Sequence, residues 1–212
     1  MSALLLLVLS FVSAKPQNAY NSIRGVDFKN FTFCWDQDDT WPSKLKWLDP
    51  SDCKPVALIN GRWREPVLDD EPRQESSFPR PFAGLILEEV QYVRLKPATE
   101  QAVIVLRRNS GGTQYSHYVF VYALERGQPA LMAAAHSGDR SYFGLSRVFV
   151  ERHQLILELF DPEKRVGDCC SEGVVRHKYL WRKGGFSEVG TPVYDKALNV
   201  SRIPVDMFGQ HP

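Results

Sequence analysis

Ala102-Val103-Ile104-Val105-Leu106 and Tyr118-Val119-Phe120-Val121-Tyr122 are the two stretches that decide the fold. Both are rich in β-branched and aromatic residues, which is typical of β-strands. Successive side chains of a strand point to opposite faces of its sheet, and here both alternating sets of positions are apolar. These stretches therefore predict the central strands of a sheet that is covered on both faces.

Apolar runs of strand length recur after residue 85, separated by short turns such as Glu125-Arg126-Gly127-Gln128. Connections this short favour antiparallel neighbours, because parallel strands need long crossovers. The expected strands are 85–95, 102–107, 118–124, 130–135, 147–150, 155–160 and 174–181. We predict a mainly β protein, an antiparallel meander that forms a sandwich or a partly open barrel, with few or no helices after the signal peptide. The expected core includes Ile104, Leu106, Phe120, Tyr122, Leu157 and Leu159.

The chain outside this meander is less regular. Residues 26–33 are expected to form a strand with a bulge or with both faces buried. Asn60-Gly61 is the strongest short hairpin signal in the chain. Prolines at 66, 72, 79 and 81 predict a surface excursion over residues 66–82. We expect one β-rich domain over residues 15–190 and a loosely ordered tail over residues 191–212.

The amino end has the features of a signal peptide over residues 1–14. An apolar run from Leu4 to Val12 is followed by small residues, with cleavage expected after Ala14. The run is shorter than the roughly 20 residues that a membrane-spanning helix needs. We therefore expect a secreted or periplasmic protein, with no membrane span in the mature chain.

The charge balance argues against a nucleic-acid partner. The 212 residues include 26 Lys and Arg against 25 Asp and Glu, a formal net charge of +1. Binding to phosphate backbones needs clustered basic residues rather than this even mixture.

The cysteines are Cys34, Cys53, Cys169 and Cys170. In an oxidising compartment they are expected to pair, and four cysteines allow three connectivities. We predict a Cys34–Cys53 disulfide, which leaves Cys169 and Cys170 as a candidate vicinal pair. Two free thiols, or crosslinks from both to the amino-terminal loop, are the alternatives. Adjacent cysteines beside His177 make a poor zinc site, so neither a metal nor another cofactor is expected.

Motifs of familiar enzymes are absent from the sequence. It contains no Gly-x-Ser-x-Gly, His-Glu-x-x-His or phosphate-binding glycine motif. Ala135-His136-Ser137-Gly138-Asp139 places His, Ser and Asp together, but neighbours on a strand face opposite ways, which favours a polar turn. Glu88 and Glu89 are candidate paired carboxylates, and solvated surface acids are the commoner alternative.

The last strong strand carries His177, Tyr179 and Trp181 on one face. If this aromatic face is exposed, it can stack on sugar rings or contact an apolar patch of a partner. If it is buried, it is the core face of an edge strand. These residues are the candidate binding site.

Several segments together resemble a family of uncharacterised exported bacterial proteins: Ser22–Phe33, Tyr118–Tyr122, Gly138-Asp139-Arg140, Gly167-Asp168-Cys169-Cys170 and Tyr179–Phe186. In that family a DFxNFTYPW start precedes a strand-rich body, and a Cys-Cys segment precedes an aromatic strand that ends in Gly-Gly-Phe. The resemblance implies a bacterial source and export, and no particular activity. Cys34 stands where the family has a proline, which favours its pairing with Cys53. Residues 94–100 lack the family's acidic loop, so the resemblance implies no calcium site here.

Two functional hypotheses follow. The first is a non-enzymatic exported domain that binds a cell-envelope component, such as a glycan, or another exported protein. The second is a secreted hydrolase whose site no sequence motif reveals.

Overall fold

The structure is a computed structural model of the chain. It describes residues 19–35, 44–49, 53–65, 83–110, 115–139, 141–166 and 170–197. The expected signal peptide and the Pro-rich excursion lie outside these ranges. In the described part, the only helices are short 3-10 turns, η1 (Ile23–Gly25), η2 (Phe28–Asn30) and η4 (Pro162–Lys164).

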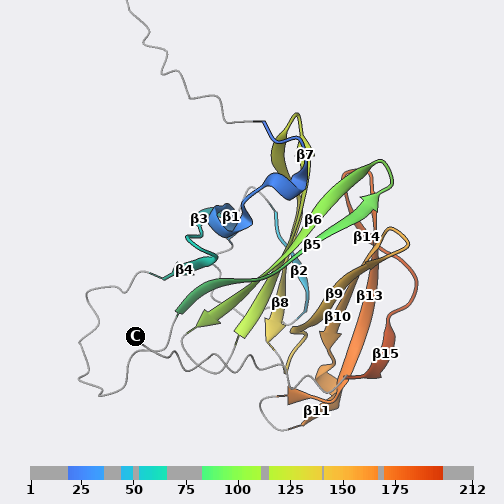
Figure 1. Ribbon diagram of the computed structural model, residues 1–212. Helices are drawn as coiled ribbons and strands as arrows, with labels where there is room; N and C mark the ends of the chain where they lie inside the picture. The colour runs from blue at the N-terminus through green and yellow to red at the C-terminus, as the bar shows by residue number, and fades with distance from the viewer. Residues whose placement is uncertain are drawn as a thin grey trace, which may run out of the picture.

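Two antiparallel sheets pack as a sandwich, which confirms the predicted fold class (Figure 1). The six-stranded sheet has the order β2-β8-β7-β6-β5-β4, and the five-stranded sheet has the order β14-β13-β10-β9, with β15 also paired to β13. The strands of the first sheet are β2 (Lys46–Trp47), β4 (Arg62–Arg64), β5 (Ala83–Lys96), β6 (Thr99–Ser110), β7 (Tyr115–Glu125) and β8 (Gln128–Asp139). Those of the second are β9 (Leu145–Glu151), β10 (Gln154–Phe160), β13 (Gly173–Arg182), β14 (Gly185–Glu188) and β15 (Val193–Lys196).

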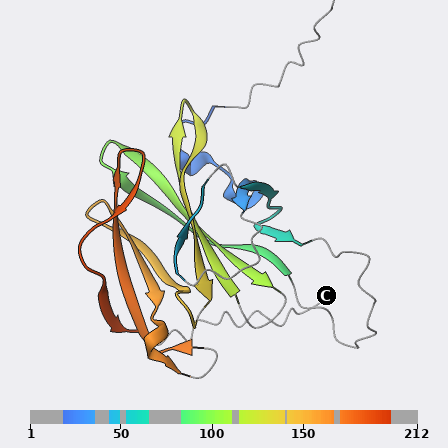
Figure 2. The ribbon, with the colours of Figure 1, turned by 180° about the vertical axis from the view of Figure 1, so that it is seen from behind.

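Two smaller sheets flank this sandwich. β1 (Thr32–Trp35) pairs with β3 (Lys54–Ala57), and β11 (Arg165–Val166) pairs with β12 (Cys170–Ser171). The amino-terminal elements and the five-stranded sheet lie on opposite sides of the six-stranded sheet, in both views (Figures 1 and 2).

This three-layer arrangement explains why residues 102–106 of β6 and 118–122 of β7 are apolar on both faces. Ile104 and Phe120 pack against the amino-terminal layer, whereas Val103 and Val119 pack against the five-stranded sheet. The prediction of central strands covered on both faces is therefore confirmed. The predicted core residues are all buried: Ile104, Leu106, Phe120, Tyr122, Leu157 and Leu159.

Of residues 26–33, predicted as one strand, only Thr32 and Phe33 lie in a strand, β1. The Ser22 hydroxyl accepts a hydrogen bond from the Arg24 amide, and the Asp27 carboxylate accepts one from the Lys29 amide. These caps stabilise the 3-10 turns η1 and η2 in place of an extended chain. Buried Phe28 points into the amino-terminal core, so the apolar residues of this segment keep their predicted burial.

The Asn60-Gly61 turn forms, with φ of 53° and 78° at the two residues. Left-handed values at both positions are those of a type I′ turn. Its arms separate after the Ile59–Arg62 bridge, because β3 pairs with β1 while β4 pairs with β5.

The tail predicted to be loosely ordered begins with a strand. β15 pairs with β13 from Gly173 to Arg176, although all its side chains are exposed. Main-chain hydrogen bonds alone hold it, which explains why no side-chain period indicated it. Residues 198–212 lie outside the described ranges.

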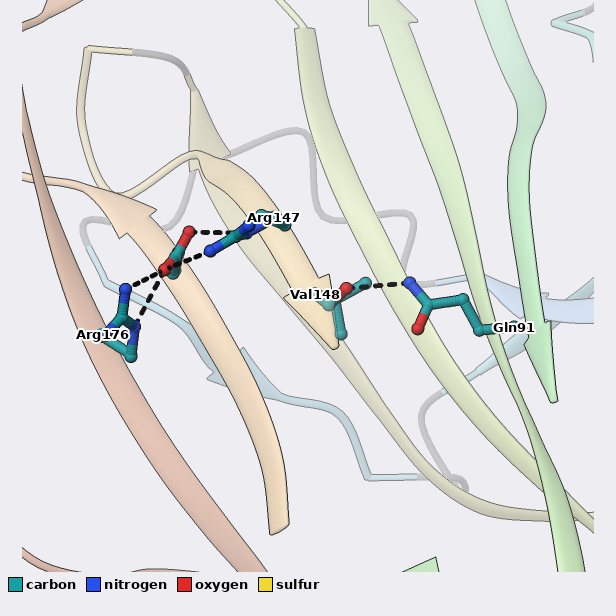
Figure 3. Close-up of polar contacts among 5 residues, drawn as sticks. Gln91, Arg147, Val148 and Arg176 are labelled. Atoms are coloured by element: carbon teal, nitrogen blue, oxygen red, sulfur yellow. Dashed lines mark hydrogen bonds and ion pairs between the residues drawn. The ribbon is translucent and has the colours of Figure 1, made fainter. Parts of the chain in front are cut away.

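Side-chain bonds to the main chain join the two sheets along the β5–β9 side. Gln91 Nε2 donates to the Val148 carbonyl of edge strand β9 at 2.8 Å (Figure 3). His153 Nδ1 lies 2.7 Å from the Arg94 carbonyl, which accepts its hydrogen. An edge strand with a satisfied carbonyl is a poorer template for unwanted strand pairing.

Candidate functional site

The predicted binding residues lie on the inner face of β13, which is turned toward the six-stranded sheet. Tyr179 is 6% exposed and belongs to the core between the sheets. Burial raises the pKa of its hydroxyl, and the nearby charge of Glu188 raises it further. For Tyr179 the structure therefore shows the buried alternative.

His177 and Trp181 remain half-exposed on either side of Tyr179. His177 Nδ1 lies 2.6 Å from Glu188 Oε1, an ion pair between β13 and β14 when the imidazole is protonated. The Trp181 ring meets Phe186 edge-on at 5.1 Å between centroids. The ammonium of Lys96, at the end of β5, stands 4.9 Å from the centre of the Trp181 ring, within cation–π range.

A further aromatic residue, Trp47, completes this group. Its ring stacks on Phe186 at 5.4 Å and meets Tyr179 edge-on at 5.2 Å. Trp47 reaches the site because the short strand β2 pairs with β8. We call Trp47, Tyr179, Trp181 and Phe186 the aromatic cluster.

Sequence reasoning missed Trp47, although a signal was present. Lys44-Leu45-Lys46-Trp47 alternates charged and apolar residues, the pattern of a half-buried strand. Leu45 and Trp47 both pack against the core between the sheets, as that alternation predicts.

The aromatic cluster combines half-exposed rings with charged groups at its rim. Aromatic faces stack on the C–H faces of sugars, and charged or polar groups beside them fix a ligand's orientation. No group of three or more potential metal ligands occurs in the described ranges.

The polar turn around His136 is built differently from a catalytic triad. The Ser137 hydroxyl accepts hydrogen bonds from the amides of His117 and Leu145, and it does not contact His136. Asp139 caps the turn by accepting from the Ser141 amide at 2.8 Å. The expected polar turn is therefore what forms.

His136 instead contacts a serine of the neighbouring strand. Ser116 Oγ lies 2.9 Å from His136 Nε2, and the imidazole stacks on Tyr118 at 4.1 Å. A register shift between Ser116 and Tyr118 brings this pair together, so sequence spacing could not reveal it. Ser116 is 0% and His136 1% exposed, so both side chains are enclosed.

Glu88 belongs to a second polar group, at a register irregularity of β5. Its carboxylate lies 3.2 Å from His117 Nε2 and 3.1 Å from Arg107 Nε. Burial opposes ionisation of Glu88, but the hydrogen bond from His117 and the charges of His117 and Arg107 outweigh it and lower the carboxyl pKa. His117 Nδ1 is buried and has no hydrogen-bond partner among the described residues, whereas Glu88 itself is exposed. The partners of Glu88 are thus basic groups, not the second carboxylate considered from the sequence.

Glu158 holds three strands of the five-stranded sheet together through Arg147 of β9 and Arg176 of β13, the two arginines labelled in Figure 3. Arg147 Nε donates to one carboxylate oxygen at 2.9 Å, and Arg176 donates to the other at 2.6 and 2.8 Å. Burial opposes ionisation of Glu158, yet the hydrogen bonds from the arginines prevail and lower its carboxyl pKa. This triad is a structural clamp across β9, β10 and β13.

The predicted Cys34–Cys53 disulfide is present, with the Cα atoms 5.0 Å apart. That separation lies within the usual disulfide range. Cys170 is also disulfide-bonded, and it cannot be crosslinked to the amino-terminal pair because those cysteines bond to each other. Cys169, the other half of the candidate vicinal pair, lies outside the described residues.

Comparisons with known proteins returned no matching family model, no similar curated protein and no similar solved structure. Among the described residues, no helix has the length and apolar character needed to cross a membrane.

Proposed function

We propose that this protein is an exported, non-enzymatic β domain that binds a cell-envelope component through the aromatic cluster. A glycan is the favoured component, and another exported protein is the alternative partner. The proposal includes a secreted or periplasmic location and membership of the exported bacterial family that the sequence resembles.

The observation that carries the proposal is the half-exposed group of Trp47, Trp181 and Phe186 with a charged rim. Trp47 and Phe186 pack against the core between the sheets and stay partly exposed, and the exposed part of an aromatic ring can stack on a sugar. The Cys34–Cys53 disulfide is compatible with export, because such bonds persist in oxidising compartments.

The competing hypothesis, a secreted hydrolase, gains no support from the polar groups around His136 and His117. The Ser116–His136 pair is enclosed, and the free nitrogen of His117 is buried. A general base must come within hydrogen-bond distance of a substrate proton, which these positions do not allow.

A pull-down from envelope extract, combined with a glycan and peptidoglycan array, tests the proposal. Trp181→Ala should abolish retention of the envelope ligand. Phe149→Ala, a half-buried aromatic on the opposite face of the same sheet, is the matched control and should retain it. Equal binding by both variants would refute the site. Release of product from an envelope polymer by the parent would favour the hydrolase.

A further inference from the structure

One end of the sandwich gathers basic side chains on three hairpin turns. The β5–β6 turn follows Arg94 and Lys96, the β9–β10 turn contains Arg152, and the β13–β14 turn contains Arg182 and Lys183. Among the described residues, Arg94, Arg152, Arg182 and Lys183 are exposed; the charge of Arg94 acts on Glu100, and the other three form no ion pair. We call these residues, together with Lys96, the basic end.

Two contacts bring the three turns together. Lys96, at the β5–β6 turn, lies over the Trp181 ring of β13 at 4.9 Å. His153, in the β9–β10 turn, donates to the Arg94 carbonyl of β5 at 2.7 Å. The basic end is therefore one surface, and it adjoins the aromatic cluster at Trp181.

Two of the acidic residues at this end have basic neighbours. Glu100 is paired with Arg24 at 2.7 Å, and Glu188 lies 2.6 Å from His177. Glu125 and Glu151 are exposed, and they are fewer than the basic residues of this end. A chain of net charge +1 thus concentrates unpaired positive charge at one end, which attracts anions.

Backbone conformation adds a second observation. Arg152, His153 and Lys183 adopt φ of 50°, 64° and 49°, in the left-handed region that disfavours such side chains. Asn-Gly adopts these left-handed φ values in a hairpin turn at lower cost, as at Asn60-Gly61. Arg126 repeats the pattern in the β7–β8 turn, at the same end of the six-stranded sheet. These values are those of two-residue hairpin turns, and the turns place basic side chains at this end of the sandwich.

We propose that the basic end binds an anionic polysaccharide whose sugar rings reach the aromatic cluster. This inference rests on the proposed function and names the ligand class. An extended polymer fits because the charges span three hairpins, and the half-exposed rings of Trp181 and Phe186 suit sugars.

An anionic membrane surface is the less suitable partner. Proteins that sit on membranes insert apolar or aromatic side chains among the lipid headgroups. The exposed large hydrophobic residues of the described chain lie outside the basic end: Ile59, Tyr142, Val166, Val193 and Tyr194.

The test measures binding of the full mature chain to polygalacturonate, to neutral dextran and to vesicles of phosphatidylglycerol and phosphatidylcholine. We expect binding to polygalacturonate alone, weakening as ionic strength rises through about 0.15 M, where screening acts within about 8 Å. The triple variant Arg152→Gln, Arg182→Gln, Lys183→Gln should bind at least about tenfold more weakly. A control variant removes the same number of exposed charges elsewhere, by Lys29→Gln, Arg62→Gln and Lys196→Gln, and should bind like the parent.

Each other outcome overturns the inference. Equal binding by the two triple variants would exclude the basic end, and binding to vesicles alone would assign it to membranes. Retention of an envelope glycan with no affinity for polygalacturonate would contradict the anionic ligand and leave the proposed function standing. Failure to retain any envelope component would contradict both.

Discussion

Replacing Glu158 by Gln removes the charge of the clamp on the five-stranded sheet and keeps its shape. The Glu158 side chain is 5% exposed, whereas those of Arg147 and Arg176 are 49% and 28% exposed. Breaking a fully buried ion pair costs about 3–5 kcal/mol, because the remaining charge stays buried. Here both arginines can turn toward water, so we expect the free energy of unfolding to fall by about 1–3 kcal/mol.

The pH dependence gives this prediction a sign. The carboxyl pKa of Glu158 is lower in the folded protein than its ordinary value. Its contribution to stability is therefore complete above the ordinary Glu pKa of about 4.3 and is lost as pH falls through the lower, folded value. The stability difference between parent and Glu158→Gln should thus be full at pH 7 and should shrink below about pH 4.

Urea unfolding followed by circular dichroism between pH 7 and pH 3.5 measures this difference. The melting temperature of Glu158→Gln at neutral pH should be about 3–10 °C below that of the parent. Glu151→Gln, an exposed carboxylate on the neighbouring strand, is the control and should change stability little. A Glu158→Gln variant as stable as the parent at pH 7, or a gap that does not change with pH, would refute the clamp.

Three further changes test the fold. Ile104→Ala should cost about 2–5 kcal/mol of unfolding free energy in denaturant titration, because Ile104 is fully buried, while Ile59→Ala, at 72% exposed, should cost almost nothing. Replacing both Cys34 and Cys53 by Ser opens a loop with a sequence separation of 19 and should lower stability by about 3 kcal/mol; non-reducing peptide mapping of the parent must show that crosslink. Gln91→Leu removes a hydrogen bond to edge strand β9, so the rate of amide hydrogen exchange in β9 should rise. An unchanged rate would show that this bond between the two sheets does not stabilise β9.

The sequence predicted strands correctly where burial requires apolar residues at regular positions along the strand. β6 and β7 are apolar on both faces because a layer covers each face, and that pattern could be read directly. β15 could not be predicted from the sequence, because its side chains are all exposed and show no alternation of apolar and polar residues. Its pairing with β13 is made by the main chain. The turns η1 and η2 arise from local capping by Ser22 and Asp27, which competes with strand formation in an apolar segment.

The candidate site was predictable only in part. Alternation along β13 placed His177, Tyr179 and Trp181 on one face, and the structure keeps them there. The sequence pattern could not show that Trp47 of β2 would join them, because the order of strands in a sheet depends on contacts between distant parts of the chain. The approach of Lys96 to Trp181 likewise depends on how two sheets pack.

Chemical-shift mapping of the isotope-labelled protein during titration with polygalacturonate tests the central claim most directly. Ligand binding at the aromatic cluster and basic end predicts shifts of the Trp181 indole and of the Lys96, Arg152 and Lys183 amides. Residues of the outer sheet face, such as Arg147, should not shift. Shifts confined to that outer face, or no shifts at saturating polymer, would contradict the account.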